Sequence, residues 1–190
     1  MSVEIEAKMK VSDLSVVRAK LPAAGAVAGA KYFEINAFFD TEDRSLLAAD
    51  HGLRLRINRD EATGKQTYVY TFKGPRQPGA LKSREEIELD VGDPKAAEKF
   101  LGALGYAKVL SFEKRREKWS LGGCSVELDE LPHLGLFVEI EGPSEAAIMA
   151  VRKTLGLDQS PIIKTSYVAM LMSYLQDQGS HDRTVTFPAA

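Results

Sequence analysis

Cysteine and histidine are scarce in this chain of 190 residues. Cys124 is the only cysteine, which excludes an internal disulfide and a cysteine-rich zinc site and fits a reducing cytoplasm. The three histidines, His51, His133 and His181, are scattered along the sequence and predict no zinc cluster. Any metal site in this chain is therefore expected to use oxygen ligands.

The sequence also lacks long apolar runs and an excess of charge of one sign. We expect no membrane segment and no secretory signal, because neither a span-length apolar stretch nor a basic region followed by one is present. The 25 Lys and Arg residues oppose 27 Asp and Glu residues, so no basic field for nucleic acid is expected. We predict a cytoplasmic monomer or homodimer, with one domain over residues 1–178 and a flexible C-terminal tail over residues 179–190.

Alternation of apolar and charged residues recurs along the chain and predicts strands. Capping residues, prolines and glycines bound four further segments that predict helices. The strands are expected over residues 3–11, 31–40, 52–58, 66–73, 82–91, 108–121, 124–131 and 136–141, and the helices over about 13–21, 93–104, 143–156 and 165–178. We expect Ile87 and Leu89 to pack against a helix, and Asp40 to form a turn rather than bind a ligand.

The charged faces of these strands repeat like charges at a spacing of two. The pattern E-x-E occurs at Glu4/Glu6, Glu86/Glu88 and Glu139/Glu141, and basic pairs occur at Arg54/Arg56 and Lys114/Arg116. Like charges at this spacing lie roughly 6.5–7 Å apart on one face and repel. An ordinary antiparallel sheet, packed on helices on one side and solvated on the other, explains the alternation but leaves this repulsion uncompensated.

A closed barrel with these faces inside would line a hydrated tunnel with both signs of charge. Arg and Lys in such a tunnel suit a polyphosphate, and carboxylate pairs suit a hard divalent cation such as Mg²⁺ or Mn²⁺. The interpretation that compensates these charges, in place of the ordinary sheet, is therefore an α+β fold. It is an eight-stranded antiparallel β-barrel with a charged interior and helices packed on the outside.

The ordered motifs of the chain resemble those of the CYTH superfamily, the triphosphate tunnel metalloenzymes. The stretch EIEAK at residues 4–8 resembles the E-x-E-x-K signature of that family. It is followed in the family's order by NAFFDT, GLRLRI, TFKGP, SREEIE, FEKRRE, ELDEL, FVEIEG and KTSYVAML. The resemblance runs from Val3 to about Leu175, nearly the whole chain.

The resemblance implies roles for individual residues. The implied metal ligands for Mg²⁺ or Mn²⁺ are Glu4, Glu6, Asp129, Glu139 and Glu141, with Glu86 and Glu88 either helping a second metal or orienting basic residues. The implied triphosphate-binding residues are Lys8, Arg54, Arg56, Lys73, Arg84, Lys114, Arg116 and Lys164. Glu4, Glu6, Lys8 and Lys164 are the implied catalytic residues. Glu127 also points inward by parity, whereas Glu85, Glu113, Arg115 and Glu117 point outward.

The function implied is that of a divalent-metal-dependent enzyme acting on a small-molecule triphosphate. It would hydrolyse a phosphoanhydride of tripolyphosphate or a nucleoside triphosphate, or cyclise ATP to cyclic AMP and pyrophosphate. The chain looks most like bacterial and archaeal proteins grouped with class IV adenylyl cyclases. A thiamine triphosphatase is an alternative, although Gly52 stands where vertebrate-type members carry a tryptophan. The alternative from another class is a non-catalytic binder of polyphosphate.

Overall fold

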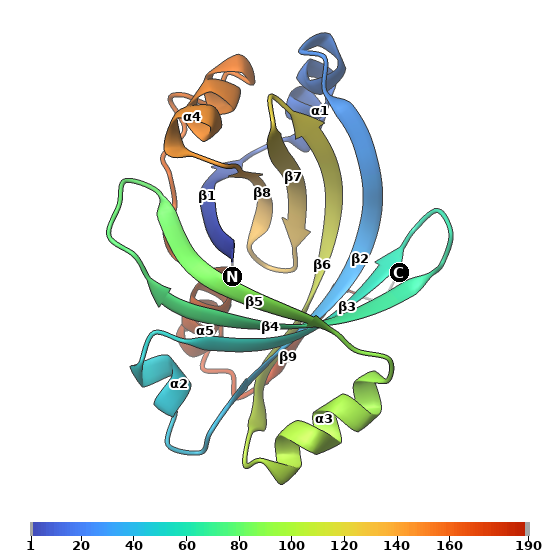
Figure 1. The fold of residues 1–190 in the computed structure, drawn as a ribbon, viewed down its shortest axis with the longest axis vertical. Coiled ribbons are helices and arrows are strands. Elements are labelled where there is room, and N and C mark those ends of the chain that lie inside the picture. The colour runs from blue at the N-terminus through green and yellow to red at the C-terminus, as the bar shows by residue number, and fades with distance from the viewer. Residues whose placement is uncertain (1, 189–190) are drawn as a thin grey trace.

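The computed structural model describes residues 2–188, which form a closed antiparallel barrel with helices outside it (Figure 1). Eight strands follow one another around the barrel in the order β2-β3-β4-β5-β1-β8-β7-β6, and pairing of β2 with β6 closes it. The strands are β1 (Ser2–Val11), β2 (Val27–Asp40), β3 (Gly52–Asp60), β4 (Gln66–Arg76), β5 (Lys82–Asp90), β6 (Ala107–Leu121), β7 (Cys124–Leu131) and β8 (Gly135–Glu141), with a two-residue β9 (Thr184–Val185) beside β6. The expected barrel is confirmed.

The helices pack against outward-facing apolar side chains. They are α1 (Leu14–Ala23), α2 (Ser45–Ala48), α3 (Pro94–Ala103), α4 (Glu145–Thr154) and α5 (Tyr167–Asp177). One core joins Leu21 of α1 and Ile148 of α4 to the outward side chains of β1, β7 and β8, including Met9. A smaller core joins Leu101 of α3 to Leu55 of β3 and its neighbours on β2. None of the helices within residues 2–188 is long and apolar enough to cross a membrane.

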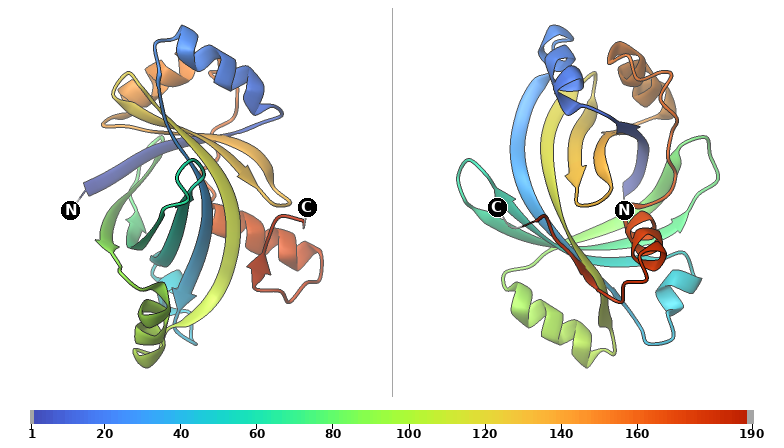
Figure 2. Two further views of the ribbon diagram at one scale, coloured as in Figure 1. Left: turned by 90° about the vertical axis from the view of Figure 1, so that its right-hand side faces the viewer. Right: turned by 180° about the vertical axis from the view of Figure 1, so that it is seen from behind.

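Helix α5 lies across one end of the barrel rather than along its side. Phe112 of β6 and Phe137 of β8 have the inward parity of the charged residues, but they contact α5 in an apolar cluster with Tyr167 and Leu171. Figure 2 shows α5 in front of the barrel when the molecule is seen from behind. The first turn of α5 is thereby brought next to the barrel interior.

The outward face of β5 is a correction to the expected packing. Ile87 and Leu89 were expected to be covered by a helix, yet Leu89 is 65% exposed and Ile87 is 48% exposed. Helix α3 is only ten residues long, and its buried side chains reach β2 and β3 instead. Both residues therefore border an open apolar groove beside α3.

Two segments outside the eight barrel strands make specific contacts with the barrel or with a neighbouring helix. Asp40 forms the expected turn: its carboxylate accepts hydrogen bonds from the backbone of Thr41, Leu46 and Leu47, which fixes the short α2. In the segment expected to be a loose tail, Val185 of β9 is buried and the amide of Phe187 donates to Glu113 of β6. Residues 189 and 190, which complete the expected tail, lie outside the described part of the chain.

Candidate active site

The barrel interior holds a cavity of about 550 Å³ lined mainly by charged side chains. Strand alternation positions them, because residues two apart on each strand point to the same side of the barrel wall. Of the residues expected in the site, the cavity is lined by Glu4, Glu6, Lys8, Arg54, Arg56, Lys73, Arg84, Glu86, Glu88, Lys114, Arg116, Glu139, Glu141 and Lys164. Only Asp129 lies behind this lining, fully buried in the wall.

Neighbouring strands β1 and β8 form an acidic wall. Glu6 pairs in register with Glu141, and Lys8 pairs with Glu139. Burial and the nearby carboxylates of Glu4 and Glu127 raise the pKa of Glu141 to about 7. Burial and the adjacent Glu86 likewise raise the pKa of Glu4. Burial, reinforced by neighbouring carboxylates, therefore disfavours ionisation of Glu4 and Glu141.

Lysines contact the acidic wall at two places. Lys82 forms an ion pair with Glu6, and Lys73 bridges Glu86 and, at 3.5 Å, Glu4. Within residues 2–188 no three Asp, Glu, His or Cys side chains converge as ligands of a single ion. The carboxylates nevertheless suit a hard divalent cation, since such a cation prefers oxygen ligands and its charge would favour the ionised form of these buried groups.

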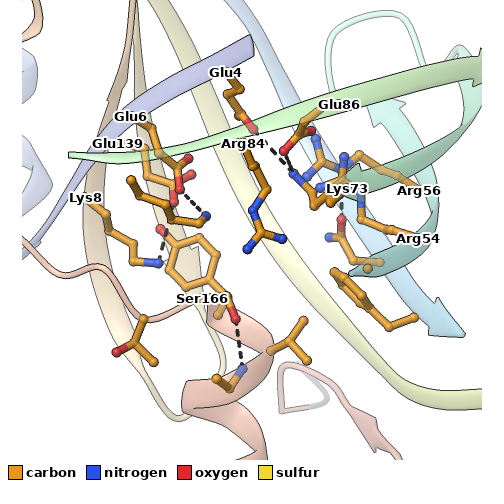
Figure 3. A pocket seen from close by; sticks show the side chains of 18 of the residues that line it. Glu4, Glu6, Lys8, Arg54, Arg56, Lys73, Arg84, Glu86, Glu139 and Ser166 are labelled. Atoms are coloured by element: carbon orange, nitrogen blue, oxygen red, sulfur yellow. Dashed lines mark hydrogen bonds and ion pairs between the residues drawn. The ribbon is translucent and has the colours of Figure 1, made fainter. Parts of the chain in front are cut away.

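Two arginines facing the cavity are incompletely paired. Arg54 and Arg84 are only 8% and 9% exposed, and nothing among the described residues accepts a hydrogen bond from either Nε atom. Arg54 donates to Thr71 at 2.8 Å, whereas the nearest carboxylate to Arg84 is Asp50 at 3.6 Å. Figure 3 shows Arg84 projecting between the group around Glu6 and the group around Lys73. Buried guanidinium groups with free donors are suited to an anion.

Arg116 is paired far more completely. Its Nε donates to Asp129 at 2.7 Å, and its terminal nitrogens contact Asp129, Glu127 and Glu139. Lys114 and the hydroxyl of Tyr167 also contact the Asp129 carboxylate. Asp129, expected as a metal ligand, thus serves in this structure as the partner of Arg116, which was expected to bind phosphate.

Lys8 and Lys164 border the cavity near α5. The ammonium of Lys8 lies 4.1 Å from the ring centroid of Tyr167, and its nearest carboxylate, Glu139, is 3.9 Å away. Burial lowers the pKa of Lys8. Lys164 donates to the backbone carbonyl of Gly79 in the β4–β5 loop.

Among the side chains that contact site residues, Glu34, Asn36, Lys82 and Tyr167 were absent from the expected site. Glu34 and Asn36 share the inward parity of β2, and Lys82 that of β5, so the alternation contained the signal for these three. Tyr167 begins α5, and no strand pattern could have placed it beside Lys8.

Comparison with known proteins decides the family. Residues 2–160 match the family model described as the CYTH domain. This chain belongs to the CYTH family.

Relatives of this CYTH chain include a protein of Methanocaldococcus jannaschii that carries the provisional name adenylate cyclase MJ0240. It is 28% identical over 177 residues, which cover 88% of this chain and 98% of the relative. The adenylate cyclase CyaB of Aeromonas hydrophila is 31% identical over 138 residues, covering 72% of this chain and 67% of its own length. Among solved structures, the PH1819 protein of Pyrococcus horikoshii OT3 matches with a TM-score of 0.78 at 27% identity, over 90% of this chain and 99% of that chain.

Proposed function

We propose that this CYTH protein is a divalent-metal-dependent enzyme that acts on a small-molecule triphosphate bound inside the barrel. The observation that carries the proposal is the pair of buried, incompletely paired arginines, Arg54 and Arg84, which line the same cavity as the acidic wall. A triphosphate would supply the anion for the arginines, and a divalent cation, which prefers oxygen ligands, would be held by the carboxylates.

The basic residues divide into two groups by their pairing. Arg54, Arg56, Arg84 and Lys114 are loosely held and would grip phosphate oxygens, with Lys8, Lys73 and Lys164 adding point charges. Arg116 would serve mainly to hold Asp129, Glu127 and Glu139 in place. In this assignment Asp129 positions Arg116. The metal ligands would then be the residues of the acidic wall, Glu4, Glu6, Glu139 and Glu141, with Glu86 and Glu88 beside them.

Bound Mg²⁺ or Mn²⁺ would act there as a Lewis acid on a phosphoryl oxygen. The chain's own residues orient the triphosphate and neutralise the negative charge that moves to the leaving oxygens. A carboxylate of this wall that does not hold the metal would accept the proton of the attacking hydroxyl. The attacking hydroxyl belongs to water in hydrolysis and to the ribose of ATP in cyclisation.

Cyclisation of ATP is the first candidate reaction, because both named relatives bear adenylate cyclase names. Hydrolysis is the second, because the charged cavity can hold a triphosphate with no organic group attached. A pure non-catalytic binder would need the basic residues but not the complete acidic wall.

The test is incubation of the purified protein with ATP, tripolyphosphate or thiamine triphosphate and with Mg²⁺ or Mn²⁺, followed by chromatographic separation of products. Cyclic AMP with pyrophosphate would identify a cyclase, and orthophosphate a hydrolase. Binding of all three compounds without any product would contradict the proposal of an enzyme.

A further inference from the structure

Glu34 is a carboxylate buried behind the basic side of the cavity. It lies on β2 with the inward parity, is 1% exposed, and is not itself part of the cavity lining. One oxygen, Oε2, lies 3.3 Å from Arg56 Nε and 3.2 Å from Lys114 Nζ, and Oε1 lies 3.8 Å from Arg116 Nε. A single carboxylate thus faces basic side chains from two strands, β3 and β6.

These contacts are looser than those of a close ion pair. Charge-assisted N–H···O bonds are typically about 2.7–2.9 Å long, and Glu34 Oε1 accepts no hydrogen bond from any residue described in the structure. Arg56 instead donates to Asn36 Oδ1 at 2.8 Å, and the Asn36 amide lies 3.4 Å from Glu34 Oε2. Glu34 therefore balances the charge of these cations without using up their donors.

The charges around Glu34 also keep it ionised. Burial would raise its pKa, but Arg56, Lys114 and Arg116 outweigh burial and hold the pKa well below its ordinary value. The cations need such a partner, since burial and the charge of Arg56 lower the pKa of Arg54 to about 10. Burial and the charge of Arg116 likewise lower the pKa of Lys114.

We propose that Glu34 is the internal counterion of the phosphate-binding cations. As a positioning residue it keeps Arg56 and Lys114 in place when the cavity holds no anion. Its negative charge also opposes a bound triphosphate, and this limits the affinity for substrate and for the phosphate product that must leave. The proposal rests on the proposed function for the identity of the anion.

The direct test is the near-isosteric substitution Glu34→Gln. Its matched control is Glu117→Gln, which removes a buried carboxylate from the opposite side of the barrel wall, where Glu117 pairs with Arg18 and Lys31. Tripolyphosphate is titrated into each protein by calorimetry in metal-free buffer with chelator. We expect about tenfold tighter binding to Glu34→Gln, from the loss of one opposing charge in a medium of intermediate dielectric, and native affinity for Glu117→Gln. Affinity of Glu34→Gln equal to or weaker than that of the control overturns the proposal.

A second variant covers the case in which Glu34→Gln does not fold. Asn36→Asp adds a negative charge beside Arg56 and should weaken tripolyphosphate binding by about tenfold. Native or tighter binding by Asn36→Asp overturns the proposal.

Turnover gives a further readout that a purely structural role would not move. With metal and the substrate found active, Glu34→Gln should lower both KM and kcat, because the ground state binds more tightly while the cations are less well positioned. If the native protein binds tripolyphosphate but turns over no triphosphate, the enzyme proposal fails and the binding test of Glu34 stands. If the native protein is active and Glu34→Gln binds no more tightly, only the counterion proposal fails.

Discussion

The hydroxyl of Tyr167 donates a hydrogen bond of 3.1 Å to the carboxylate of Asp129. Tyr167 is the first residue of α5, and Asp129 lies in β7 behind the cavity lining. The ring of Tyr167 also lies beneath the ammonium of Lys8. One side chain therefore connects the helix at the end of the barrel to both a buried carboxylate and a cavity lysine.

Tyr167→Phe should lower the free energy of unfolding by about 1–3 kcal/mol, because it removes a partner from a buried carboxylate but retains the ring under Lys8. Urea unfolding measures the change. Tyr174→Phe on the same helix is the matched control, since the Tyr174 ring stacks on His133 instead of lying in the barrel. Equal stability of the two variants would contradict the role given to the Tyr167 hydroxyl.

Arg116→Met should destabilise the protein by about 3–5 kcal/mol, because it leaves three buried carboxylates without their shared cation. Arg54→Met should cost less stability, since Arg54 donates to Thr71 and lies 3.8 Å from the exposed Glu88. Arg54→Met should weaken tripolyphosphate binding more than the outward Arg115→Met. Urea unfolding midpoints measure the stability of each variant, and calorimetry measures its affinity for tripolyphosphate. A greater loss of stability in Arg54→Met than in Arg116→Met would contradict the structural role given to Arg116.

Glu6→Gln should reduce metal-dependent turnover by on the order of 100-fold, because an amide oxygen is a weaker ligand for a hard cation and even outer partners of metal sites contribute about 10–100-fold. Glu85→Gln, on the outward side of β5, should leave turnover near the native rate. The rates are measured across a titration of Mg²⁺ or Mn²⁺. Full native activity in excess chelator would exclude the metal requirement.

Glu141 should make stability depend on pH in metal-free buffer. Its pKa is raised from 4.5 to about 7, so between these values the folded chain retains a proton that the unfolded chain releases. Stability should therefore fall as pH rises through this window, and less so in Glu141→Gln. Thermal melting of both proteins from pH 4.5 to 8 in chelator measures the difference; parallel profiles would show that Glu141 does not titrate as described.

Leu89→Ala should change stability by less than about 0.5 kcal/mol, because the side chain is largely exposed beside α3. Leu55→Ala should cost about 2–5 kcal/mol, because Leu55 is buried between β3 and α3. Urea unfolding of the two variants distinguishes a covered from an uncovered outer face. A large loss in Leu89→Ala would mean that something packs on β5 in solution.

Strand parity was predictable from the sequence because it depends on local spacing alone. Glu4, Glu6, Arg54 and Arg56 all face the cavity as their alternation predicts, and Arg115 points outward. The direction of a side chain on a strand follows from its neighbours in the chain. The barrel itself followed from the need to compensate like charges on every polar face.

The pairing across the barrel was not predictable in this way. Whether Asp129 meets a metal or Arg116 depends on the register of β6 with β7, where these two residues lie opposite each other. The burial of Glu34 depends likewise on the register of β2 with β6, and the exposure of Leu89 on which strands α3 covers. The relationships of Glu34 and Leu89 are long-range, whereas Arg116 and Asp129 are 13 residues apart and their pairing follows from the register of the β6–β7 hairpin.

The pairing of β2 with β6 is one of three long-range strand pairings, with β1–β5 and β1–β8, that the closed barrel requires. This pair joins segments far apart in the chain, and Glu34 lies opposite Lys114 within it. Long-range pairings form slowly, since the chain must lose loop entropy before the new contacts compensate. Until these two strands meet, the inward charges face solvent and no enclosed cavity is present. The enclosed site therefore requires closure of the barrel, so a chain in which β2 and β6 stay unpaired would contain every proposed ligand residue and still lack the cavity.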